Sequence, residues 1–123
     1  MTTFERLKNY FSESGLSDGF IQQDYIWNEK EGNDSDSYIV FQQLNGTGRI
    51  DDLSGDDFFT VLLISGKAWI EFIVQRANEI LEYVRCHSRS HNIGFIINTS
   101  GFVNPIQTTE GRFIIPLSFR CTS

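Results

Sequence analysis

The residues most able to do chemistry lie in one short stretch, "CHSRSH", which holds Cys86, His87 and His91. A thiolate and two imidazoles are ligands that zinc accepts. A tetrahedral site needs a fourth donor, and Cys121 is a candidate, but the spacing lacks the second ligand pair of a zinc motif. We therefore favour a buried cysteine and two histidines at a helix end over a metal site.

Cys86 and His87 are also a candidate nucleophile and base. Neighbouring residues of a helix project about 100° apart, so these two side chains do not face each other. No glycine-rich elbow precedes Cys86. The sequence thus predicts no catalytic residue and no cofactor.

A second group of chemically active residues is acidic. The segment "NGTGRIDD", residues 45–52, resembles a phosphate-binding loop, but it lacks the Lys-Ser/Thr pair and does not open into a helix. Four carboxylates lie in this segment or shortly after it: Asp51, Asp52, Asp56 and Asp57. Their spacing does not match a calcium loop. We interpret them as a solvated acidic loop and as a candidate partner surface.

The aromatic residues Trp27, Trp69 and Phe72 are candidates for recognition, although aromatics near helical apolar positions more often belong to a core. Trp69 and Phe72 lie partly off the apolar stripe of their predicted helix. A helix that is apolar on more than one face has a second surface to bury. We therefore predict that these two residues contact a partner subunit.

Composition limits the class of protein. The chain has 123 residues, 40% of them hydrophobic, and a formal net charge of −6. That length suits one domain, residues 1–123, with a core that needs no metal. The charge argues against binding of nucleic acid or anionic membranes by bulk electrostatics. We see neither a signal peptide nor an apolar run of membrane-spanning length, so a cytosolic protein with reduced thiols is expected.

Two helices are predicted. Residues 2–13 carry one apolar stripe and begin with Thr2 and Glu5, which fit a capping box, while Gly15 suits the helix end. Residues 68–87 follow the helical period over about five turns, with charged residues on the opposite side. Its last turn carries Arg85 and His87, and the helix dipole favours basic residues at this end.

The rest of the chain indicates strands. Runs rich in apolar and β-branched residues predict strands over 38–44, 58–65, 93–99 and the final stretch 111–120, with a weaker one over 20–29. In the strand 93–99 we expect Ile93, Phe95 and Ile97 on one face. The order of elements predicts an α+β fold, an antiparallel or mixed sheet with a short N-terminal helix and one long helix packed on one face.

The final stretch, "GRFIIPLSFR", combines a strand pattern with a proline. Pro116 lacks an N–H, so it belongs at a sheet edge, at a bulge, or where the missing donor faces away from the neighbouring strand. Ile114 and Pro116 form the face opposite the core residues and are candidates for a subunit contact. Arg112 and Arg120 flank the stretch as charged residues that guard an apolar edge do.

These elements together resemble a known family. The strand "YIVFQ", the acidic connection, the strand "FFTVLLIS", the helix "QRANEILEYVR" and the ending "TTEGRFIIPLSFRCT" are similar to the small tail-terminator, or tail-completion, proteins of long-tailed bacteriophages and prophages. The resemblance covers nearly the whole chain. The family has no catalytic motif to transfer, so no active site follows from it.

The resemblance implies a structural protein that forms a ring, typically a hexamer, on the head-proximal end of the tail tube. Such a ring stops tube polymerisation and offers a surface to the head, so the implied partners are further copies, the tube protein and a head-completion or neck protein. It would assemble in the host cytoplasm and reside in the virion tail. Acidic residues in 30–37 and 45–57 would keep a ring lumen from holding the passing DNA. Two alternatives remain open: a head–tail joining or minor capsid component, and a small ligand- or metal-binding domain that uses Cys86, His87 and His91.

Overall fold

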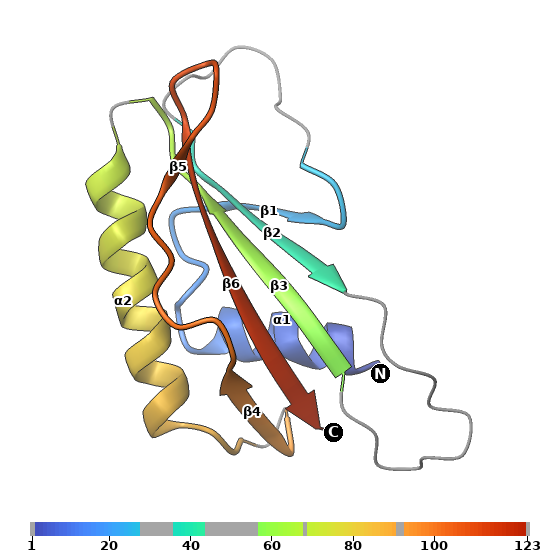
Figure 1. The fold of residues 1–123 in the computed structure, drawn as a ribbon. Helices are drawn as coiled ribbons and strands as arrows, with labels where there is room; N and C mark the ends of the chain where they lie inside the picture. The colour runs from blue at the N-terminus through green and yellow to red at the C-terminus, as the bar shows by residue number, and fades with distance from the viewer. Residues whose placement is uncertain (1, 28–35, 44–56, 68, 91–92, 123) are drawn as a thin grey trace.

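The computed structural model describes residues 2–27, 36–43, 57–67, 69–90 and 93–122. The described elements follow the chain in this order: α1 (Thr3–Glu13), β1 (Ile21–Asp24), β2 (Tyr38–Gln43), β3 (Asp57–Ile64), α2 (Ile70–Cys86), β4 (Phe95–Asn98), β5 (Ile106–Gln107) and β6 (Phe113–Thr122). They form a mixed, open six-stranded sheet with two helices (Figure 1). The predicted α+β fold is confirmed.

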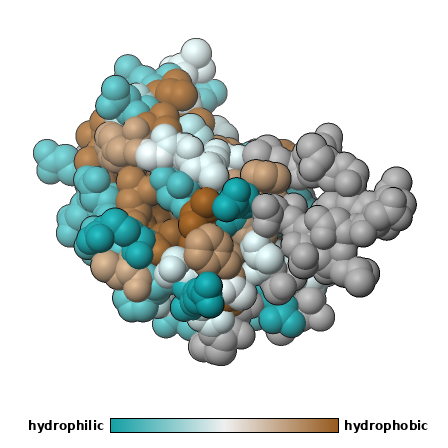
Figure 2. Space-filling view, turned by 60° about the horizontal axis from the view of Figure 1, so that its bottom comes forward, coloured by the Kyte–Doolittle hydropathy of each residue, from teal (hydrophilic) through white to brown (hydrophobic). Residues whose placement is uncertain are grey.

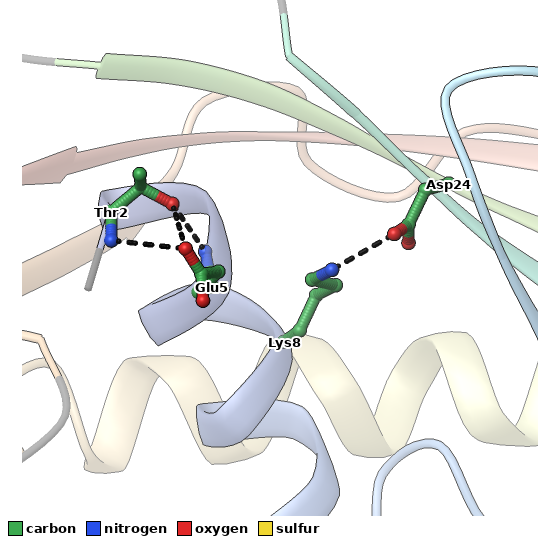
Figure 3. Close-up of polar contacts among 4 residues, drawn as sticks. All are labelled: Thr2, Glu5, Lys8 and Asp24. Atoms are coloured by element: carbon green, nitrogen blue, oxygen red, sulfur yellow. Dashed lines mark hydrogen bonds and ion pairs between the residues drawn. The ribbon is translucent and has the colours of Figure 1, made fainter.

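Local sequence determines both ends of α1. Thr2 accepts the amide of Glu5 at 3.1 Å, and the Glu5 carboxylate in turn accepts the Thr2 amide at 3.4 Å, which completes the capping box (Figure 3). At the other end Gly15 takes a φ of +79°, and the amide of Leu16 donates to the carbonyl of Phe11. This is the Schellman pattern, in which a left-handed glycine closes the last turn.

One face of the sheet carries the main core. Its side chains come from both helices and from β2, β3, β4 and β6, and include Leu7, Phe11, Ile80, Leu117 and Phe119, all without solvent exposure. Phe11 packs edge-on against Phe119, with ring centroids 5.9 Å apart. Both helices therefore cover the same face, and α2 runs along the sheet in Figure 1. On the opposite face a smaller buried cluster is made of Tyr38, Val40 and Ile64.

The strand order is β1-β2-β3-β6-β4, and β5 also pairs with β6. β6 therefore lies inside the sheet, which excludes the sheet edge among the three placements predicted for Pro116. The amide of Ser118 bonds to Ser100, on the side away from β3. Amides of alternate residues point to the same side of a strand, so the nitrogen of Pro116 also faces away from β3. Its missing donor costs no hydrogen bond there, which is the third of the predicted placements.

Two further predictions need correction. Arg112 does not guard an edge, because it is fully buried and its Nη1 donates to the carbonyls of Asp36 and Ser65 at 2.6 and 3.2 Å. The prediction that Ile93, Phe95 and Ile97 share one face is wrong for Ile93, which joins the main core together with Ile96 of β4, whereas Phe95 and Ile97 are half-buried. Neither described helix combines the length and hydropathy that a membrane span needs.

Candidate functional site

The cysteine and histidine at the end of α2 engage their own helix. Cys86 is exposed, so the prediction of a buried cysteine is wrong. Its Sγ donates to a carboxylate oxygen of Glu82 at 3.6 Å. The ring of His87 stacks on Tyr83 with centroids 4.0 Å apart, and its Nδ1 lies 3.1 Å from the carbonyl oxygen of Tyr83. The thiol and the imidazole thus each contact the preceding turn, which is not the geometry of a nucleophile and its base.

The other metal-ligand candidates do not join them. Cys121 is buried in the core, and burial raises the pKa of its thiol to about 12, so it stays protonated at neutral pH. Over the residues that the structure describes, no three His, Cys, Asp or Glu side chains gather as metal ligands. His91 lies outside those residues.

Of the four carboxylates predicted to form an acidic surface, one lies within the described residues. Asp51, Asp52 and Asp56 lie outside the described residues. Asp57 is the first residue of β3, is only 6% exposed and lies opposite Cys121 in β6. Its assignment to a solvated loop is therefore wrong, since the strand begins one residue before the apolar run and carries this residue into the sheet.

Trp69 and Phe72 differ in exposure. Trp69 precedes the first residue of α2 and is 54% exposed. Phe72 is half-buried and stacks on Phe20, with centroids 4.9 Å apart. With Gly19 and Asp36 they line a pocket of about 220 Å³. Trp69 is therefore exposed, whereas Phe72 packs partly within the chain, and a contact of either residue with a partner stays a prediction.

Ile114 and Pro116 lie on the face of the sheet opposite the helices. Ile114 packs against the buried cluster of Tyr38, Val40 and Ile64 and is itself half-buried. Pro116 is also half-buried. The exposed Ile106 of β5 pairs with Ile114. A partly covered apolar patch therefore occupies this face, and its contact with a subunit stays a prediction.

A groove of about 540 Å³ lies between α2 and the edge strand β4. Its lining is mainly apolar and consists of Leu81, Val84, Arg85, Ser88, Phe95, Ile96, Ile97, Asn98 and Gly101. Figure 2 brings the end of the molecule that carries β4 forward and shows hydrophobic surface (brown) bordered by hydrophilic residues (teal). Arg89 lies above the ring of Phe95, 5.9 Å from its centroid, and adds a positive charge beside the groove.

The opposite edge of the sheet, β1, is polar. Gln22 and Asp24 are exposed, and the carboxylate of Asp24 pairs with Lys8 of α1 at 2.9 Å (Figure 3). Directly after the strand, Tyr25 and Ile26 are 56% and 70% exposed. One edge of the sheet therefore offers an apolar groove, and the other offers a polar strand followed by two exposed apolar side chains.

The sequence did not predict either edge. The groove exists because α2 and β4 lie side by side, and no pattern in the sequence indicates that these two elements are neighbours. The available signal was the apolar stripe of the long helix, which continues to Leu81 and Val84 in its last turns. The exposure of Ile26 was not predicted, because residues 20–29 show only a weak strand pattern that does not indicate which side chains are exposed.

Comparison with known proteins identifies a family. A search of curated proteins finds no match to this chain. A family model described as "Phage tail termination protein" matches residues 1–123, the full length of the sequence. That family is structural, resides in the virion tail and implies contacts with other tail and head components. The chain belongs to the phage tail termination protein family.

Proposed function

We propose that the protein forms a hexameric ring of identical subunits at the head-proximal end of the phage tail tube. The ring caps the tube and ends its polymerisation, and its opposite surface receives the head-completion or neck protein. The full-length match to the tail termination family is the observation that carries this proposal.

The surfaces of the subunit support a ring. Head-to-tail rings need two different patches on each subunit, because the patch that gives a contact differs from the one that receives it. The groove beside β4 and the strand β1 lie at opposite ends of one sheet and differ in character. A closed ring built through such ends leaves no sheet edge open to uncontrolled pairing.

Charge supports passage of DNA through the ring. The chain carries a net charge of −6, and a lumen of that sign repels phosphates and lets the genome slide. Within this proposal, Asp51, Asp52 and Asp56 contribute to the lumen or to a mating surface.

Deletion of the gene in the phage that carries it tests the function. Because nothing would cap the tube, we expect tails longer than wild type and heads without tails, as measured by negative-stain electron microscopy. Supply of the wild-type chain from a plasmid restores the normal length distribution. Tails of normal length beside unjoined heads would favour the alternative, a head–tail joining component. Normal infectious particles would contradict both.

A further inference from the structure

The outer edge of β1 carries four backbone groups that face away from the sheet. The amides of Ile21 and Tyr25 donate to carbonyls on the β2 side at 2.8 and 2.7 Å. In a parallel pair, alternate residues bond to the neighbour, so Gln22 and Asp24 point their backbone groups outward. Both residues are exposed.

One outward group of β1 is already satisfied. The carbonyl of Asp24 accepts the amide of Ile26 at 2.8 Å, across a turn in which Tyr25 has a φ of +69°. A bond between residues two apart around a positive φ is the strained form of the γ-turn. Among the bonds that the described residues form, the groups that remain for a partner are the N–H and C=O of Gln22 and the N–H of Asp24.

The outer edge of β4 has a matching set. The amide of Thr99 donates to Ser118 of β6 at 2.9 Å, which turns the backbone groups of Ile96 and Asn98 outward by the same alternation. The outward amide of Ile96 is occupied, because it donates to the carbonyl of Ser88 at 2.8 Å. Within the part of the chain that the structure describes, the groups that remain are the C=O of Ile96 and the N–H and C=O of Asn98.

Strand direction makes these two edges compatible. β1 runs parallel to β2, and each later neighbour in the order β2-β3-β6-β4 is antiparallel to the last. β4 is therefore antiparallel to β1. A second copy placed beside the first, with its helices on the same face, brings its β1 antiparallel to β4. Each of the two strands has four residues.

We propose that β4 of one copy pairs antiparallel with β1 of the next copy, in the register that sets Asn98 opposite Gln22 and Ile96 opposite Asp24. Asn98 and Gln22 then exchange two hydrogen bonds, and the Asp24 amide donates to the Ile96 carbonyl. The fourth position of this ladder joins the Ile96 amide and the Asp24 carbonyl, and these two groups are the ones already bonded within each subunit. This inference rests on the proposed ring and assigns its subunit contact.

Side chains agree with this register. The carboxylate of Asp24 reaches Lys8 on α1, so it lies on the helix side of the sheet, as does the buried Ile96. In the paired copies Asp24 thus approaches the groove, where Arg85 is already paired with Glu82 and Arg89 lies above the ring of Phe95. The carboxylate of Asp24 then meets the positive charge of Arg89.

A disulfide tests the register. Gln23 and Ile97 fall opposite each other in this pairing, at a position without mutual hydrogen bonds, where Cα atoms lie about 4.5 Å apart. That separation suits a disulfide. The variant combines Gln23→Cys and Ile97→Cys with Cys86→Ser, which removes the exposed native thiol. Concentrated protein is oxidised and analysed by non-reducing electrophoresis, with circular dichroism to confirm folding.

We expect a ladder of dimer, trimer and higher species, several-fold stronger than in a control that pairs Gln23→Cys with Phe95→Cys, two residues out of register. Equal ladders from the two variants would overturn the register. Dimers alone, formed also by Ile97→Cys without Gln23→Cys, would show that β4 pairs with β4 and overturn the proposal. Rings in native mass spectrometry without the crosslink would overturn the strand pairing and leave the ring intact. A chain that forms no oligomer in solution or on tails would overturn both.

Discussion

The two edges of the sheet are held in different ways. β4 is held by the core, because the side chain of Ile96 is fully buried between β6 and α2. In addition, the outward amide of Ile96 donates to the carbonyl of Ser88. β1 has no fully buried residue and is held by its ladder to β2 and by the ion pair between Lys8 and Asp24.

This difference indicates a division of roles. The β4 edge is a fixed receiving surface, since its position follows from the core. The β1 edge is a polar strand whose charge and strained turn discourage pairing with arbitrary partners. Each edge nonetheless leaves three backbone groups outward, and the two sets are complementary only in one register.

The largest expected effect tests the anchoring of β4. Ile96→Ala removes a fully buried side chain and leaves a cavity, so it should lower the free energy of unfolding by about 3 kcal/mol. Gln22→Ala, at the exposed edge, should change it by less than about 0.5 kcal/mol. Urea unfolding followed by circular dichroism measures both. Similar losses in the two variants would contradict the contrast between the edges.

The second effect tests the backbone orientation of β1. Gln23→Pro removes an amide that faces β2 and should cost about 2 kcal/mol, because a ladder acceptor is left unpaired. Gln22→Pro removes an outward amide and should cost less than about 1 kcal/mol in the isolated subunit. Gln22→Pro should nevertheless weaken oligomer formation, measured by native mass spectrometry. A Gln22→Pro subunit as unstable as Gln23→Pro would contradict the assigned orientation.

The smallest effect concerns the ion pair that holds β1 to α1. Lys8→Met keeps most of the side-chain length and removes the charge that contacts Asp24 at 2.9 Å. Because both groups are partly exposed, the loss of stability should be about 0.5 kcal/mol at low salt. The same comparison in 1 M NaCl is the control, since screening should remove most of the difference. A loss that does not respond to salt would assign the effect to the contact of Lys8 with the ring of Phe4.

Sequence reasoning succeeded where the signal was local. The capping box of Thr2 and Glu5, the glycine that ends α1 and the apolar period of α2 each act within a few residues, and the structure has all three. The strand pattern also located β2, β3 and β6 to within one or two residues, because their apolar runs are long.

It failed where the outcome depends on distant partners. Arg112 donates to carbonyls of residues that lie 76 and 47 positions away in the chain, and no local sequence pattern predicts such hydrogen bonds. The central position of β6 is likewise a matter of topology. β4 has four residues, too few for alternation alone to decide which side chain faces the core. The groove and the outward groups of both edges follow from these placements, so they too were beyond prediction.

Electron cryomicroscopy of the head-proximal end of isolated tails tests the central claim most directly. We expect a ring in which the sheet continues from subunit to subunit, with β4 of one copy antiparallel to β1 of the next and Asn98 opposite Gln22. A ring whose subunits meet through other surfaces, with β1 and β4 both facing solvent, would contradict it.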